Sequence, residues 1–218
     1  MRIFVVIPAY NEGGAIGQTL ADVKKYYRDI AVVDDGSTDE TARVAEEAGA
    51  VVLRHIVNRG QGAALRTGIR YALENGADII VTYDADGQFE PSEIAKVAAP
   101  ILAGERDVVL GSRFLQENKI PILRRVTLGV AGVFTRVISG LKLTDTHNGF
   151  RAFSRRAAEA MQIRQDRMAH ASEILQEIGR MKLNYCEVPV TVKYTDYSRA
   201  KGQKLSGVIK IIFDLIFK

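Results

Sequence analysis

The chain has 218 residues, of which 47% are hydrophobic and 26% are charged, and its formal net charge is +4. This length and balance indicate one globular domain with a sizeable core. The weak, scattered positive charge argues against a nucleic-acid-binding protein, and a single cysteine, Cys186, excludes a disulfide framework. No run reaches 18 apolar residues, so the sequence predicts no membrane-spanning helix.

The amino-terminal part alternates short apolar runs with helical patterns. The apolar runs predict strands at residues 3–7, 30–33, 50–53 and 77–83, and the intervening segments predict helices that end near residues 27, 48 and 73. Pro8 has no amide hydrogen and is expected to end the first strand, while Ser37 or Thr38 is expected to cap the second helix. This alternation predicts a mainly parallel sheet with right-handed crossovers.

Acidic and polar side chains follow the predicted strands at the points where these strands end. They are Tyr10 and Glu12 after the first strand, Asp34 and Asp35 after the second, and Asp84 and Asp86 after the fourth. The carboxyl ends of parallel strands share one edge of a sheet, where ligands of open α/β sheets bind. Two carboxylates one residue apart suit a hard cation such as Mg²⁺ or Mn²⁺. We therefore expect a metal-dependent site at this edge.

Other nucleotide-binding motifs fit the sequence poorly. A P-loop requires Gly-x-x-x-x-Gly-Lys-Ser/Thr, which does not occur. The segment Gly60-Gln61-Gly62 lacks the third glycine of a dinucleotide-binding fingerprint and does not follow the first strand. The pair Asp84 and Asp86 lies in mid-chain, whereas the Asp-x-Asp arrangement of phosphatases would lie on the first strand.

The carboxyl-terminal part carries further predicted elements. Residues 107–110 and 183–190 are expected to be strands, and residues 126–143 and 169–175 are expected to be helical. Pro189 places its strand at an edge of the sheet, because proline cannot donate to a central ladder. The tail, residues 205–218, predicts an amphipathic helix that lies in a membrane interface, on the domain or against a second subunit. We expect residues 1–204 to form the main domain.

Four segments, taken together, resemble glycosyltransferase family 2. They are Pro8-Ala9-Tyr10-Asn11-Glu12, Val33-Asp34-Asp35-Gly36-Ser37-Thr38-Asp39, Asn58-x-Gly60-x-Gly62 and Asp84-Ala85-Asp86-Gly87-Gln88. They occur in the order of the family, and the similarity as a whole covers roughly residues 1 to 200. In detail they are similar to the branch of dolichyl-phosphate mannose synthases and other polyprenyl-phosphate glycosyltransferases.

The resemblance implies an α/β protein with the A-type glycosyltransferase fold, a Rossmann-like, mainly parallel sheet flanked by helices. It also implies a nucleotide-diphosphate-sugar donor such as GDP-mannose or a UDP-sugar, a Mg²⁺ or Mn²⁺ cofactor, and transfer with inversion at the sugar carbon. A cation that bridges the diphosphate oxygens would stabilise the negative charge that develops on the leaving group.

The resemblance also assigns roles to individual residues around the donor. Pro8, Tyr10, Glu12 and Asp35 match positions that hold the base and ribose, and Val33 matches a backbone contact to the base. Asp84, Ala85 and Asp86 match the nucleotide and metal site, with Gln88 as a further metal ligand. Arg113 and Arg125 match arginines that approach phosphate, and Arg199 and Lys204 lie in a segment that resembles a loop closing over the diphosphate.

The acceptor side is predicted from two further segments. Residues 144–151 resemble the family's Asp-x-Thr-Ser-Gly-Phe-Arg, although His147 and Asn148 stand where Thr and Ser are usual. Glu173 matches an acidic position that faces the acceptor. A hydroxyl acceptor would need a general base, for which Glu173 is the first candidate and Asp145 the second. A phosphate acceptor is already ionised and needs no base, and the sequence leaves both acceptors open.

The predicted protein is a metal-dependent, inverting glycosyltransferase that moves a hexose from a nucleotide-diphosphate sugar to a polyprenyl (dolichyl) phosphate. The predicted catalytic residues are Asp86, Arg113, Arg125, Glu173 and Asp145. The alternatives are transfer to a sugar or other hydroxyl and, from another class, a non-catalytic nucleotide-sugar-binding module. We expect a cytoplasmic protein with peripheral contact to the cytoplasmic face of a membrane and with no nucleic-acid partner.

Overall fold

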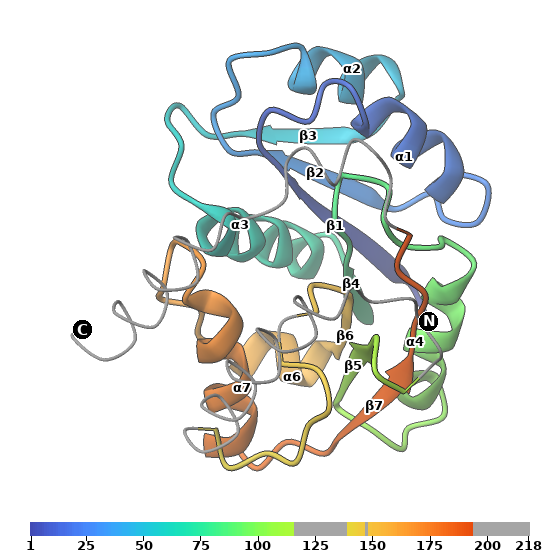
Figure 1. Ribbon diagram of the computed structural model, residues 1–218, viewed down its shortest axis with the longest axis vertical. Coiled ribbons are helices and arrows are strands. Elements are labelled where there is room, and N and C mark those ends of the chain that lie inside the picture. Colours follow the sequence, from blue (N-terminus) through green and yellow to red (C-terminus); the bar gives the residue numbers. More distant parts are fainter. Residues whose placement is uncertain (116–138, 147, 194–218) are drawn as a thin grey trace.

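The computed structural model describes residues 1–115, 139–146 and 148–193 (Figure 1). Several expectations therefore lie outside the described residues. They concern Arg125, His147, Arg199, Lys204, most of the predicted helix at 126–143, and the helix at 205–218.

Seven strands form one sheet in the order β3-β2-β1-β4-β6-β5-β7 (Figure 1). Their bounds are β1 Ile3–Ala9, β2 Ile30–Asp34, β3 Val51–Arg54, β4 Ile79–Thr82, β5 Val108–Ser112, β6 Arg151–Ser154 and β7 Tyr185–Pro189. β6 runs antiparallel to β4 and β5, and the other neighbouring strands pair in parallel. The predicted mainly parallel sheet and the edge position of the strand that contains Pro189 are confirmed.

Helices cover both faces of the sheet (Figure 1). Their bounds are α1 Ile16–Val23, α2 Thr41–Glu47, α3 Gln61–Glu74, α4 Glu93–Leu102, α6 Arg155–Ala160 and α7 His170–Arg180. The apolar sides of α1, α2 and α4 pack with one face of the sheet, and those of α3, α6 and α7 pack with the other. The sheet is thus the middle layer of a three-layer α/β structure.

The strands and helices follow from the distribution of their apolar residues. All five residues of β2 and all four of β4 are buried, as expected for strands that helices cover on both faces. In α7, Ile174, Leu175 and Ile178 are buried, whereas Arg180 is exposed, so one stripe of the helix faces the core.

The expectation that Pro8 ends the first strand is wrong, because β1 continues to Ala9. Backbone groups of a strand point alternately to its two neighbours. The carbonyl of Ala9 accepts from Asp35 beyond β2, and that of Val6 accepts from Tyr83 beyond β4. The nitrogen of Pro8 therefore faces the β4 side, where the register with β4 has already ended at Val6. The missing amide hydrogen costs no ladder bond at that place.

The predicted cap of the second helix is also wrong. α2 begins at Thr41, later than expected, and its N-terminus has no side-chain cap. Asp39 instead accepts a hydrogen bond from the Thr41 amide at 3.0 Å. Ser37 and Thr38 are used in a different contact, with the turn that follows β1.

Three described elements, α4, β6 and the short helix α6, were not predicted. α4 has apolar residues at Ile94, Val97, Ala98 and Ile101, a helical spacing that the sequence contains and that the internal Pro100 obscures. β6 has only four residues and begins with a charged residue, Arg151, so its burial depends on the strands that flank it.

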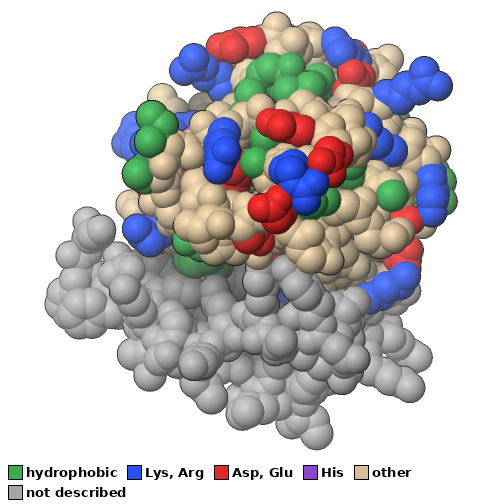
Figure 2. Space-filling model, turned by 90° about the horizontal axis from the view of Figure 1, so that it is seen from above, with side chains coloured by type: hydrophobic (Ala, Val, Ile, Leu, Met, Phe, Trp, Pro, Cys, Tyr) green, Lys and Arg blue, Asp and Glu red, His purple; other side chains and the backbone are tan. Residues whose placement is uncertain are grey.

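No helix among the described residues is both long enough and apolar enough to cross a membrane. On the face that Figure 2 shows, acidic and basic side chains are interspersed, and neither sign dominates a large area. This distribution agrees with the small net charge of the chain.

Candidate active site

The turns after β1 and β2 are joined to each other at the carboxyl edge of the sheet. Asn11 has a left-handed backbone, with φ of 53°. Its amide donates to Ser37 Oγ at 2.9 Å, and its side-chain oxygen accepts from the Thr38 amide at 2.9 Å. The Glu12 amide donates to Thr41 Oγ1 at 2.7 Å. These bonds fix the segment that carries Tyr10, which is exposed and available to a ligand.

Asp35 is buried below this edge and anchors the turn that opens α3. Its Oδ1 accepts from the Arg59 amide at 3.0 Å and lies 2.7 Å from His55 Nδ1, and its Oδ2 accepts from the Gly60 amide at 2.6 Å. His55 in turn contacts Thr67 Oγ1 at 2.9 Å. Both carboxylate oxygens of Asp35 are thus already bonded within the protein.

Other residues expected near the base are placed by the same strands. Pro8 is half-buried at the end of β1, and the side chain of Val33 is fully buried within β2. Ala85 is buried, and its carbonyl accepts from Thr19 Oγ1 of α1 at 2.9 Å. The backbone between Asp84 and Asp86 is therefore held against α1.

Two glycines allow a second loop to approach the amino terminus of α3. A Cβ on Gly60 would lie 2.4 Å from the Asp166 carbonyl oxygen, and one on Gly62 would lie 2.0 Å from the Gln165 carbonyl oxygen. Gly60 also has φ of 108°, which glycine adopts without strain. The segment 165–167 therefore packs directly on the Asn58–Gly62 turn.

Asp84 lies where the ends of several strands converge. Gln61 Nε2 of α3 approaches its Oδ1 at 3.5 Å, and a Cβ on Gly149 would come within 2.8 Å of the same oxygen. Burial raises the pKa of Asp84 to about 7, and the neighbouring Asp86 carboxylate adds to the rise. Arg151 and Arg113 act in the opposite direction. The structure thus brings together groups that the sequence places far apart.

The predicted donor set for a metal consists of Asp84, Asp86 and Gln88. Two carboxylates and an amide oxygen are hard ligands of the kind that Mg²⁺ and Mn²⁺ prefer, with phosphate oxygens and water completing the shell. Asp86 Oδ1 accepts from the Gln88 amide at 3.1 Å, and the Gln88 side chain donates to Asp86 Oδ2. Within the described residues, no three His, Cys, Asp or Glu side chains form a complete metal site. The set therefore fits a cation that the substrate phosphates help to hold.

Arg113 and Asp145 form a buried, two-pronged ion pair. Arg113 Nε and Nη2 donate to Asp145 at 2.7 and 2.8 Å, and the Arg113 amide donates to Asp145 Oδ2 at 3.0 Å. The loop that carries Asp145 is held by Glu187 of β7, whose Oε1 accepts from the Asp145 amide at 2.9 Å. Two predicted catalytic residues are thus partners of each other.

Glu173, the first candidate for a general base, also anchors a loop. Its Oε2 accepts from the amides of Arg164 and Gln165 at 2.9 and 2.8 Å. This is the loop that packs on Gly62 at the start of α3. The Glu173 carboxylate therefore stabilises the backbone of this loop.

Three buried polar residues near Asp84 were absent from the predicted site. Arg151 is 4% exposed and donates from Nε to the Asn148 carbonyl oxygen at 2.9 Å. Burial lowers the pKa of His170 to about 4, and the positive charge of Arg151 adds to this effect. Asn148 Nδ2 is buried and finds no hydrogen-bond partner among the described residues, so a ligand oxygen could accept from it. In the sequence, the motif Asn148-Gly149-Phe150-Arg151 could have pointed to Asn148 and Arg151 as site residues.

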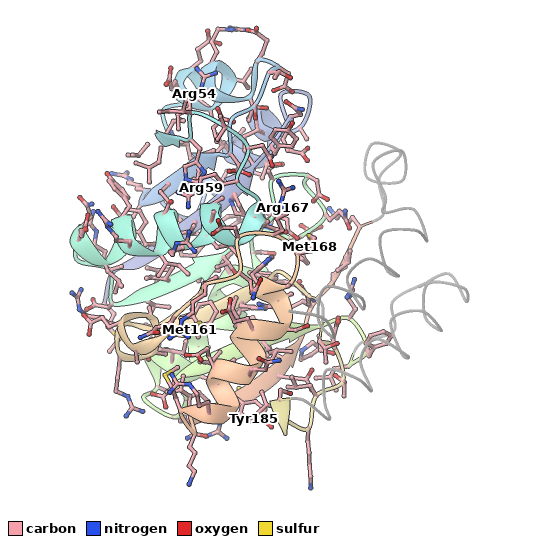
Figure 3. All side chains as sticks on the ribbon, turned by 90° about the vertical axis from the view of Figure 1, so that its left-hand side faces the viewer. Arg54, Arg59, Met161, Arg167, Met168 and Tyr185 are labelled. Carbon is pink, nitrogen blue, oxygen red and sulfur yellow. The ribbon has the colours of Figure 1, made fainter. Side chains whose placement is uncertain are left out.

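The rim of this edge carries exposed arginines. Arg59 and Arg167 come from different loops and both lie near the amino terminus of α3, with Arg54 beyond them on β3 (Figure 3). Arg54 Nε lies 3.2 Å from Asp34, and Arg59 Nη2 lies 3.6 Å from Asp166. Exposed cations beside a carboxylate pair suit a ligand that carries phosphate.

A groove of about 450 Å³ lies on the α1 side of Asp86. Its lining includes Gln18, Asp22 and Lys193, but none of Pro8, Tyr10 and Asp35. The groove therefore flanks the segment that carries Asp86, and it lies away from the edge where the base of the nucleotide is expected.

Comparison with known proteins identifies the family. The model of glycosyl transferase family 2 matches residues 4–161. The UDP-N-acetylglucosamine–dolichyl-phosphate N-acetylglucosaminyltransferase of Methanococcus voltae is 35% identical, over 98% of this chain and 94% of the relative. The undecaprenyl-phosphate mannosyltransferase of Micrococcus luteus is 29% identical, over 92% of this chain and 87% of the relative.

A solved structure shows the same fold. Glucosyl-3-phosphoglycerate synthase from Mycobacterium tuberculosis, in complex with Mn²⁺, UDP and glucosyl-3-phosphoglycerate, superposes with a TM-score of 0.75 at 19% identity. The match covers 99% of this chain and 78% of that chain. With the family model and the relatives, it confirms the predicted A-type fold. The chain therefore belongs to glycosyl transferase family 2 and is a glycosyltransferase.

Proposed function

We propose that the protein is a metal-dependent, inverting enzyme that transfers a hexose from a nucleotide-diphosphate sugar to a polyprenyl phosphate. The names of two relatives support this acceptor, since they specify dolichyl phosphate and undecaprenyl phosphate. The UDP and Mn²⁺ bound to the similar solved structure support this type of donor and cofactor.

The choice of acceptor rests on one observation, which is that both candidate general bases already have partners within the protein. Asp145 is engaged on both oxygens by Arg113, and Glu173 holds the loop at residues 164–165. A base must be able to accept a proton from the acceptor. Because both carboxylates already have structural partners, an acceptor that arrives ionised is favoured over a neutral hydroxyl.

The residues at the carboxyl edge of the sheet suit a one-step reaction in which the acceptor displaces the nucleoside diphosphate from the sugar. Asp84, Asp86 and Gln88 would hold the cation, which supplies Lewis-acid stabilisation of the leaving diphosphate when bound. Arg113 brings a positive charge to the same edge, in an orientation that Asp145 fixes. An oxygen of the acceptor phosphate would then attack the anomeric carbon from the side opposite the diphosphate, which inverts the configuration.

The first experiment measures sugar transfer to a short polyprenyl phosphate with Mn²⁺ and either GDP-mannose, UDP-glucose or UDP-N-acetylglucosamine. We expect one donor to be used, and Asp86→Ala to reduce the rate at least about a hundredfold, since metal stabilisation amounts to several kcal/mol. Glu159→Ala, an exposed acid on α6, is the matched control. Nucleotide-sugar binding without transfer or donor hydrolysis would indicate the non-catalytic module instead.

The second experiment separates the acceptors. Glu173→Gln keeps an oxygen that can accept from the amides of residues 164 and 165, but removes the capacity to act as a base. With a phosphate acceptor we expect the rate to change only a few-fold. A fall of about a hundredfold or more, the size of a general-base effect, would instead favour the hydroxyl acceptor.

A further inference from the structure

Arg151 lies in a central strand of the sheet, next to the strand that leads into Asp84. It is the first residue of β6, and its Cα pairs with Thr82 of β4 and Leu110 of β5. Directly paired residues of neighbouring strands point to the same face of a sheet. Asp84 follows Thr82 by two residues, just beyond the end of β4, and Gln61 of α3, a helix on that face, approaches its carboxylate. The Thr82 hydroxyl donates to the Gly149 carbonyl oxygen at 2.6 Å, which fixes this register.

The guanidinium of Arg151 is enclosed by the site. The residue is 4% exposed, and Nε donates to the Asn148 carbonyl oxygen. Gly149, which follows Asn148, packs so closely on Asp84 that a Cβ there would lie 2.8 Å from Asp84 Oδ1. The Arg151 charge also acts electrostatically on the carboxylates of Asp84 and Asp145. Asp145 is in turn paired with Arg113. Four buried or half-buried charges thus alternate in sign, from Asp84 through Arg151 and Asp145 to Arg113.

The chemistry of this chain of charges requires a cation at its centre. A carboxylate removed from water is costly unless a positive partner and hydrogen bonds compensate for the lost hydration. Asp84 has a second carboxylate, Asp86, two residues away, so repulsion increases that cost. The planar guanidinium combines this positive charge with N–H donors in fixed directions, one of which holds the Asn148 carbonyl oxygen, and an ammonium group fixes such a bond less well.

We propose that Arg151 is a positioning residue of the active site, which holds the Asn148–Gly149 segment against the Asp84 carboxylate and so keeps Asp84 in place for metal and nucleotide. This inference rests on the proposed function, since it assumes that Asp84 contributes to a metal-nucleotide site. Arg151 itself need not touch the substrate. Its effect would pass through the Asn148–Gly149 segment to the Asp84 carboxylate.

The test compares Mn²⁺ affinity, with and without UDP, for the wild type, Arg151→Met and Arg151→Lys by titration calorimetry. Removing a group that orients a metal ligand typically weakens metal binding by about 10–100-fold. We expect such a loss for Arg151→Met and a smaller one for Arg151→Lys, which keeps the charge. Arg155→Met is the matched control, because Arg155 starts α6 and pairs with Glu159 outside the site.

The direction of the change in Mn²⁺ affinity shows whether Arg151 positions a metal ligand or only repels the cation. If the Arg151 charge merely repelled the cation, Arg151→Met would bind Mn²⁺ more tightly, and the proposal would be overturned. Unchanged affinity in a folded Arg151→Met variant would overturn it as well. Should that variant fail to fold, the Lys variant decides, because it keeps the charge but loses the Nε bond to the Asn148 carbonyl oxygen, and this loss must then weaken Mn²⁺ binding relative to the wild type and to Arg155→Met. Absence of Mn²⁺ and UDP binding in the wild type would instead refute the proposed function.

Discussion

Gly62 occupies a place where a side chain has no room. A Cβ there would lie 2.0 Å from the Gln165 carbonyl oxygen, which is backbone and cannot rotate away. We expect Gly62→Ala to lower the free energy of unfolding by about 1–3 kcal/mol, as is typical of overpacking. Denaturant unfolding measures this change. Gly17→Ala in α1 is the control, because its Cβ would meet only the movable tip of Val44 at 3.1 Å, and similar losses for both variants would contradict the prediction.

We expect His170 to make stability depend on pH. It is 4% exposed and packs on Gly62 at the start of α3, with the charge of Arg151 nearby, and its Nδ1 donates to the Arg167 carbonyl oxygen. Its pKa is about 4 in the folded state, against an ordinary value of 6.5. The unfolded chain therefore binds the proton more readily between these values, and stability rises with pH across this window.

The expected contribution of His170 is fully present above about pH 6.5 and is lost as the pH falls towards 4. The shift corresponds to at most about 3 kcal/mol. Unfolding free energies of the wild type and His170→Gln, measured at several pH values in this range, should show the steeper slope for the wild type. Parallel slopes would show that His170 titrates normally.

At the scale of elements, β7 holds the acceptor-side loop from the edge of the sheet. The Glu187 carboxylate accepts from the amides of Thr144 and Asp145, both at 2.9 Å through Oε1. Hydrogen bonds to a charged group contribute about 1.5–3 kcal/mol, so Glu187→Ala should speed amide exchange at residues 144 and 145 at least about tenfold. Sugar transfer should also fall, since Asp145 orients Arg113.

The control for the β7 prediction is Glu177→Ala, which removes an ion pair with Arg180 within α7. Hydrogen exchange followed by NMR resolves the individual amides. If the amides of Thr144 and Asp145 stay protected in Glu187→Ala, the loop is held by other contacts, and β7 has no part in positioning Arg113.

At the scale of the whole molecule, the sheet edge couples ligand binding to global stability. A ligand that binds only the folded state, at a hundred times its dissociation constant, adds about 2.7 kcal/mol. For a chain of 218 residues this corresponds to a rise in Tm of about 5–10 °C. We expect Mn²⁺ with UDP or GDP to produce such a rise, EDTA to reverse it and Asp86→Ala to abolish it. An equal rise in that variant would place the nucleotide elsewhere.

The sequence by itself was sufficient for the order of most elements and for the convergence of the acidic strand ends. The spacing and the number of apolar residues in each segment identify buried strands such as β2 and β4. A parallel arrangement of these strands then brings Glu12, Asp84 and Asp86 to one edge of the sheet. The motifs were also sufficient for the family. These inferences succeed because local apolar patterns determine strands and helices, and because the ends of parallel strands meet.

Only the tertiary structure decided how the polar residues of this edge are used. Asp35 and Glu173 anchor loops, and Arg113 is paired with Asp145, although each of these residues had a predicted ligand or catalytic role. Arg151 gained its central place because β6 inserts antiparallel between β4 and β5. Such partners are distant in sequence, and which carboxylate meets which donor depends on strand order and register, which apolar periodicity does not encode.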